Sequence, residues 1–191
     1  HGPRGEDGSV QGLLELADVA YVGAGIAASA VGMDKELARA VFAQAGLRQT
    51  EFLVIRRSAW SADRQGALEE IETKLRYPLF VKPVNLGSSI GISKVHDSQS
   101  LDRAIDLAAG YDVKIMVEAS VENARELECA VLGNDDPKAS VIGEIIPGAE
   151  FYDYTTKYID DCSQLIVPAE LPESISAEIQ RMSVDAFRSI D

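Results

Sequence analysis

A chain of 191 residues can bury a substantial hydrophobic core, and one or two compact units are expected. The formal net charge is −13, with 46% hydrophobic and 6% aromatic residues, which is ordinary for a soluble α/β protein. This charge argues against nucleic acid or an anionic membrane surface as the main partner, because both require a basic face. The longest uncharged apolar stretch, residues 19–33, is also shorter than the roughly 20 residues of a membrane span.

Helix and strand patterns follow one another from residue 34 to residue 118. The first is a helix at 34–45, with Asp34 as its N-cap and Gly46 as its stop. The others are a strand at 52–57, a helix at 62–76, strands at 79–83 and 90–95, a helix at 98–109 that Gly110 closes, and a strand at 113–118. From residue 52 this order spells β-α-β-β-α-β, the split βαβ arrangement.

The rest of the chain has a different pattern. Two strands are predicted at 126–133 and 140–148, followed by a long polar and aromatic loop at 149–164. Connections of this length without regular structure tend to be functional lids. The apolar positions from Ile175 to Ile190 fall on one stripe of an amphipathic helix.

The segment FVKPVNLGSSIGISKV, residues 80–95, joins two predicted strands through a glycine–serine loop. It is not a Walker A loop, because GK[ST] is absent and a strand follows where a helix is needed. The GAG at 23–25 likewise lacks the third glycine of a dinucleotide fingerprint. What remains is a hairpin tip whose glycines let backbone amides approach an oxyanion, with Lys82 on the preceding strand. A plain glycine hairpin is the alternative.

Five segments in chain order resemble the D-alanine–D-alanine ligase family of the ATP-grasp superfamily. They are HGPRGEDG (1–8), MDK (33–35), VKPVNLGSSIGISKV (81–95), ELECAVLGND (126–135) and EFYDYTTKY (150–158). The resemblance implies an α/β (α+β) ATP-grasp fold. It would divide into the end of an N-terminal α/β domain (1–31), a central lid domain (32–118) and the first part of a C-terminal domain (119–191), with ATP between two sheets.

The family pattern also has parts that this sequence does not show. A glutamate that orients the first substrate would precede His1. An Asp followed by Glu and Asn, which bind the metal, would come after Asp191, so no metal ligand is expected within this chain. The resemblance therefore implies an internal fragment.

The activity implied by the resemblance is ATP-dependent ligation of two D-alanines to D-alanyl-D-alanine for peptidoglycan, through an acyl phosphate. Its cofactors would be ATP and Mg²⁺ or Mn²⁺, in the bacterial cytoplasm, with a homodimer when the protein is full length and no nucleic acid or membrane partner. The alternatives are a D-alanine–D-lactate (depsipeptide) ligase, or a catalytically silent nucleotide-binding module. Tyr158 within YTTKY favours the dipeptide branch, and the intact set of site residues argues against a silent module.

The resemblance assigns ATP-binding roles to seven residues. Lys35 and Lys82 would neutralise phosphate oxygens, and Lys157 would reach the phosphates once the long loop folds over. Backbone groups at Glu118 and Val121 would read adenine. The remaining two are Ser89 in the glycine loop and Glu126, which would accept from the ribose hydroxyls. By position alone, Lys35 and Lys82 are equally consistent with solvated surface lysines. For Glu126 the alternative is an exposed carboxylate at the end of a strand.

The substrate side of the family site corresponds to His1, Ser88, Lys157 and Tyr158, of which His1, Ser88 and Tyr158 would be catalytic. Ser88 and Tyr158 would be linked by a hydrogen bond that closes the cavity. His1 would lie beside the reacting carboxylate of the first D-alanine. Taken alone, a terminal histidine such as His1 is more often incidental.

Overall fold

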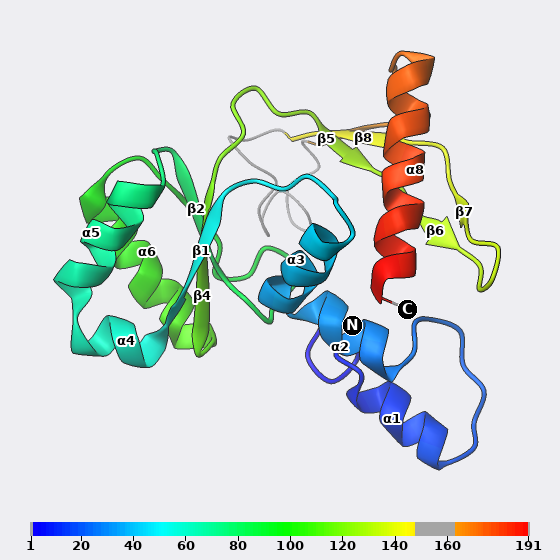
Figure 1. The fold of residues 1–191 in the computed structure, drawn as a ribbon, viewed down its shortest axis with the longest axis horizontal. Helices are drawn as coiled ribbons and strands as arrows, with labels where there is room; N and C mark the ends of the chain where they lie inside the picture. The colour runs from blue at the N-terminus through cyan, green and yellow to red at the C-terminus, as the bar shows by residue number, and fades with distance from the viewer. Residues whose placement is uncertain (1, 148–162, 191) are drawn as a thin grey trace. The chain divides into compact units, whose positions relative to one another are not determined.

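The computed structural model describes residues 2–147 and 163–190, which belong to two compact units. Unit 1 runs to Arg39 and resumes over Gln49–Glu122, whereas unit 2 comprises Ala40–Arg48 and the residues after Glu122. Figure 1 colours the chain by residue number, so that unit 1 is largely blue to green. The domain boundaries expected at residues 31 and 118 stay a prediction.

Unit 1 is built on one antiparallel sheet of four strands in the order β1-β4-β2-β3. The strands are β1 (Phe52–Arg56), β2 (Leu79–Pro83), β3 (Ser93–Val95) and β4 (Lys114–Ala119). Strand β4 pairs with both β1 and β2, so that Val117 lies opposite Leu53 on one side and Val81 on the other. Together with α5 and α6 this arrangement confirms the predicted β-α-β-β-α-β order.

Three helices of unit 1, α4 (Arg57–Ala62), α5 (Arg64–Lys74) and α6 (Ser98–Tyr111), cover one face of this sheet (Figure 1). Alternate strand residues point toward them, because successive side chains of a strand face opposite sides. The resulting core combines apolar side chains from the helices and the strands. Its fully buried members include Trp60, Ile71, Leu79, Val81, Leu101, Ile105, Ile115 and Val117.

Several predicted boundaries in unit 1 are wrong by a few residues. Helix α6 continues through Gly110, since the Asp112 N–H donates to the Ala108 carbonyl at 3.1 Å. The strand predicted at 90–95 begins only at Ser93, because residues 88–91 form a turn in which the Ile90 N–H donates to the Gly87 carbonyl. Helix α4 was not predicted, and it ends at the residue before the N-cap of α5.

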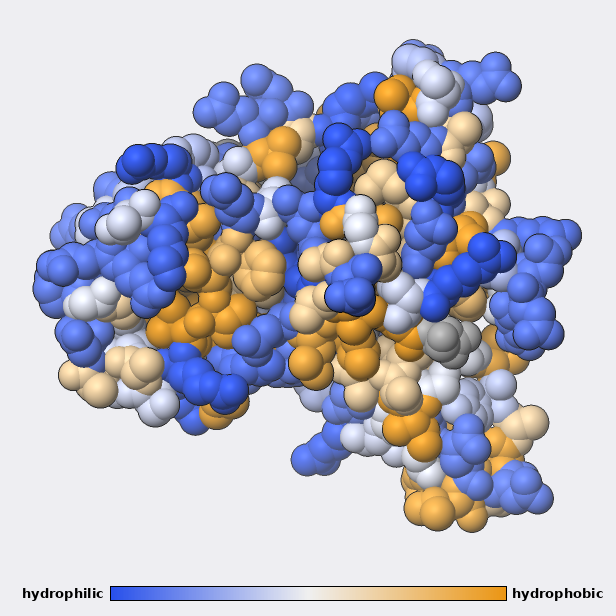
Figure 2. Space-filling view, in the orientation of Figure 1, coloured by the Kyte–Doolittle hydropathy of each residue, from blue (hydrophilic) through white to orange (hydrophobic). Residues whose placement is uncertain are grey.

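The N-terminal part of unit 1 contains α1 (Ser9–Leu16) and α2 (Ile26–Met33). Helix α1 buries none of its residues fully, and Leu16 and Val22 are 90% and 97% exposed. In Figure 2 apolar atoms gather at the end of the molecule where Figure 1 places α1. Contiguous exposed apolar residues of this kind usually mark a contact surface.

In its described residues, unit 2 contains a three-stranded sheet, a two-stranded sheet and one long helix. The first sheet has the order β5 (Glu126–Glu128), β8 (Gly143–Ile146), β9 (Gln164–Ile166). The second joins β6 (Val131–Leu132) to β7 (Lys138–Ala139), and the helix is α8 (Glu173–Ile190).

The strands of unit 2 are shorter than predicted. The strand expected at 126–133 is divided into β5 and β6, and at this break the Ser140 hydroxyl accepts from the Ala130 N–H at 3.0 Å. The predicted long loop lies almost wholly outside the described residues, and β9 begins where it was expected to end. Across the described ranges, no helix is both long enough and apolar enough to cross a membrane.

The core of unit 1 leads to a stability prediction on a single helix. Ile105→Ala on α6 should lower the free energy of unfolding by about 2–5 kcal/mol, because its fully buried side chain leaves a cavity. Leu107→Ala on the same helix is the control: its side chain is 48% exposed, so the loss should stay below about 1 kcal/mol. Urea unfolding followed by the fluorescence of Trp60, which lies in this core, measures both. Equal losses would show that α6 does not pack by this face.

Candidate functional site

The sheet face opposite α4, α5 and α6 carries charged side chains. On β4 the alternation that turns Ile115 and Val117 into the core sends Lys114 and Glu118 to the other side. On β2 it sends Lys82 to that side in the same way. The start of α3 (Lys35–Gln44) contacts this face, so charged groups of a helix and of two strands meet there.

The first turn of α3 is fixed to β4 by an ion-pair cluster. Asp34 caps the helix as predicted, since its Oδ1 accepts from the N–H groups of Glu36 and Leu37 at 3.0 and 3.1 Å. The Lys114 ammonium donates to Asp34 Oδ2 at 2.6 Å and to Glu36 Oε2 at 2.7 Å. Burial disfavours the charge on Lys114, but the hydrogen bonds that its ammonium donates to the two carboxylates outweigh this effect and raise its pKa. The residue after the cap, Lys35, is thereby held in place.

The Lys35 side chain reaches across to the end of β2. Its ammonium donates to the Val84 carbonyl at 3.1 Å and also to the Leu86 carbonyl, just before the glycine–serine loop. Burial, and then the neighbouring charge of Lys82, lower the pKa of Lys35 to about 8. The two predicted phosphate-binding lysines therefore lie close enough in unit 1 to influence each other electrostatically.

Lys82 is bound to a carboxylate that a second cation also contacts. The Lys82 ammonium donates to Glu118 Oε1, and the Arg39 guanidinium donates to Glu118 Oε2. The Glu118 side chain is only 11% exposed, so both pairs form away from bulk water. Glu118 was predicted to act through its backbone, whereas the structure also gives its carboxylate a defined role in holding Lys82.

The glycine–serine loop is anchored at its base and turns sharply at its tip. The Asp112 carboxylate accepts from the backbone and side-chain amide of Asn85 at 2.8 and 3.1 Å. Ser88 and Ser89 at the tip have φ values of 52° and 56°. Gly91 has φ 72°, and a Cβ there would come within 2.9 Å of side-chain atoms of Tyr111 and Pro83, so this position requires glycine.

The other predicted site residues lie in later segments of the chain or outside the described residues. Val121 is exposed in the segment after β4, and Glu126 opens β5 in unit 2. His1, Lys157 and Tyr158 fall outside residues 2–147 and 163–190, so their roles stay predictions. Among the residues that the structure describes, no group of three His, Cys, Asp or Glu side chains could hold a metal ion.

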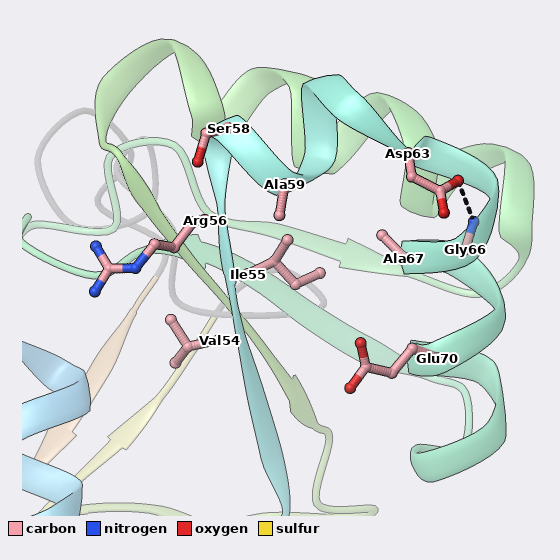
Figure 3. A pocket seen from close by; sticks show the side chains of 9 residues that line it. All are labelled: Val54, Ile55, Arg56, Ser58, Ala59, Asp63, Gly66, Ala67 and Glu70. Carbon is pink, nitrogen blue, oxygen red and sulfur yellow. Dashed lines mark hydrogen bonds between the residues drawn. The ribbon is translucent and has the colours of Figure 1, made fainter.

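A cavity of about 540 Å³ elsewhere in unit 1 does not coincide with this site. It lies between β1 and helices α4 and α5, and none of the predicted site residues lines it. In Figure 3 the Asp63 carboxylate is engaged with the Gly66 N–H as the cap of α5, and the Arg56 guanidinium points away from Glu70. Because these charged groups do not converge, the cavity offers no common position for a charged ligand.

Arg39 and Lys114 were missed by reasoning from the sequence. Both pair with residues about 80 positions away, and no local pattern specifies such partners. One signal was available: Lys114 and Glu118 have opposite charges at same-face positions of a predicted strand, and the helix at 34–45 has the complementary order Asp34, Glu36, Arg39.

The chain is similar to known ligases along its whole length. The family described as D-ala D-ala ligase C-terminus matches residues 41–191. The D-alanine–D-alanine ligase of Acetivibrio thermocellus is 52% identical over 191 residues, which are 100% of this chain and 50% of that protein. That of Bacillus cytotoxicus is 53% identical over the same 191 residues, with 52% of its own length covered. The chain thus spans about half the length of the curated relatives it matches.

Solved structures agree with the sequence relatives. The VanG D-Ala:D-Ser ligase from Enterococcus faecalis matches with a TM-score of 0.87 and 39% identity, covering 100% of this chain and 54% of that one. The D-alanine–D-alanine ligase from Coxiella burnetii matches with a TM-score of 0.84 and 36% identity, covering 100% and 49%. These matches confirm the predicted α+β ATP-grasp fold. With the family match over residues 41–191, they show that the chain belongs to the D-alanine–D-alanine ligase family.

Proposed function

We propose that the full-length protein carrying this sequence joins two D-alanines into D-alanyl-D-alanine, using ATP, for peptidoglycan synthesis. The observation that carries the proposal is the pair Lys35 and Lys82 beside a glycine–serine hairpin, in a chain about half identical to D-alanine–D-alanine ligases over its whole length. A homodimer in the bacterial cytoplasm is part of the same proposal and rests on the family alone.

The reaction needs a carboxylate to become an electrophile. ATP supplies the phosphoryl group that converts the carboxylate of the first D-alanine into an acyl phosphate, and phosphate leaves when the amine of the second D-alanine attacks. Positioning and charge neutralisation provide most of the catalysis in phosphoryl transfer. Closed loops must also keep water away from the acyl phosphate, which would otherwise hydrolyse.

The residues of unit 1 fit the phosphate part of this task. Lys82 provides a cation at the end of β2, and Lys35 provides a second one that already donates to backbone carbonyls. The turn at Ser88 and Ser89 has positive φ values, and backbone N–H groups in such turns can form anion-binding concavities. These groups would hold the nucleotide phosphates. No residue that the structure describes is assigned as a ligand of the proposed Mg²⁺ or Mn²⁺.

The proposal is tested by product analysis of the full-length protein with ATP, Mg²⁺ and D-alanine. We expect D-alanyl-D-alanine by mass spectrometry and one phosphate per dipeptide. Lys82→Ala should lower kcat/KM for ATP at least about tenfold, because a charge-assisted contact is worth about 1.5–3 kcal/mol. Lys74→Ala removes an exposed lysine from α5 and should leave the rate unchanged. A full-length protein that forms no dipeptide would refute the ligase proposal.

The lowered pKa of Lys35 predicts a pH dependence of nucleotide binding. Lys35 is cationic below its pKa of about 8 and neutral above it, so ATP affinity should fall as the pH rises through this value. Above it, binding should take up a proton, because phosphate favours the charged lysine. Calorimetry in buffers of different ionisation enthalpy measures the uptake.

Lys35→Arg is the matched control for this pH dependence, since a guanidinium stays protonated over the whole range. The variant should bind ATP with an affinity that is flat around the same pH. An equally steep dependence in the arginine variant would show that another group is responsible.

A further inference from the structure

The guanidinium of Arg39 is fixed by contacts on several sides within unit 1. Its Nη1 donates to the Thr50 carbonyl at 3.0 Å and to the Thr50 hydroxyl at 3.1 Å. Its central carbon lies 4.7 Å from the centre of the Phe52 ring, within the range of a cation–π contact. Nη2 donates to Glu118, so the direction of that bond is determined by the other contacts.

The two oxygens of the Glu118 carboxylate accept hydrogen bonds from two different cations. One oxygen accepts from Arg39 and the other from Lys82. The Arg39 and Glu118 side chains are 18% and 11% exposed, so the pair lies where charges are weakly screened by water. The contacts therefore form a series that runs from Arg39 through Glu118 to Lys82. At its first end Thr50 and Phe52 hold Arg39 in place.

We propose that Arg39 is a positioning residue for nucleotide binding, which acts on Lys82 through Glu118. Arg39 binds one oxygen and so orients the other toward Lys82, which keeps the ammonium on the sheet face where it influences Lys35. Arg39 also takes up part of the negative charge of Glu118. Without Arg39, Lys82 would be the sole cation bonded to this carboxylate among the residues that the structure describes, and it would be harder for a phosphate to recruit.

This inference rests on the proposed function, because it assumes that Lys82 meets the nucleotide. It differs from a general stabilising role in one respect. A structural residue would affect ATP binding whether or not Lys82 is present, whereas a residue acting through Lys82 can do so only when Lys82 is there. Coupled residues show this as non-additivity in a double-mutant cycle.

The experiment is such a cycle on the full-length protein, with the dissociation constant for ATP measured by calorimetry. Arg39→Ala should weaken ATP binding roughly fivefold or more, whereas in the Lys82→Ala background the same change should have little effect. The KM for D-alanine should change less than about twofold, because Lys82, on which Arg39 acts, is assigned to the nucleotide and not to D-alanine. Arg103→Ala, at an exposed position of α6, controls for the loss of a positive charge.

A second variant covers the case in which Arg39→Ala does not fold. Arg39→Lys keeps the charge but offers a single ammonium, which cannot reproduce the fork that joins Thr50 to Glu118. It should weaken ATP binding less than Arg39→Ala and show the same dependence on Lys82. Melting temperatures of all variants identify any that are unfolded.

The outcomes separate this inference from the proposal on which it rests. Unchanged ATP affinity in Arg39→Ala, or equal weakening with and without Lys82, overturns the positioning role while leaving Lys82 in place. Unchanged affinity in Lys82→Ala itself would overturn the proposed role of Lys82, and the inference with it. Dipeptide formation by the unaltered protein judges the ligase activity independently of both.

Discussion

Strand β4 is the element on which unit 1 depends, because its two faces serve different purposes. Along its length it pairs with β1 and β2, and its inward residues Ile115 and Val117 complete the core under the helices. Its outward residues Lys114 and Glu118 bind α3 by ion pairs. A slip of one residue in this register would bring charges into the core and apolar groups to α3, so the core and the candidate site are specified together.

The elements that sequence reasoning found are those with strong local signals. Asp34 caps a helix as predicted, strand β2 has the predicted bounds, and the amphipathic stripe after Ile175 is helix α8. The prediction that α6 ends before Gly110 was wrong, because a glycine inside a helix costs only about 1 kcal/mol relative to alanine. Ala108 and Ala109, which precede Gly110 on the same helix, are buried.

In the candidate site, too, the residues found from the sequence are those with local signals. Lys35 and Lys82 could be found because they belong to short motifs, and the structure brings them together. Arg39 could not be found, because its value lies in a contact with Glu118 that only the folded chain creates. The predicted bounds of the strands in unit 2 were wrong for a related reason. Their breaks depend on which groups the backbone binds, such as Ala130 with Ser140, and not on the apolar pattern.

The carboxylate of Glu118 has a further consequence for turnover, given the proposed role of Lys82. An ammonium that already has a partner loses that contact when phosphate arrives and regains it when phosphate departs. The free energy gained on capture is therefore only a difference between two ion pairs, which limits how tightly any nucleotide is held. The proposed ligase would release ADP in every cycle, and the Glu118 carboxylate beside Lys82 would lower the barrier to that step. Glu118 would thus favour exchange as much as binding.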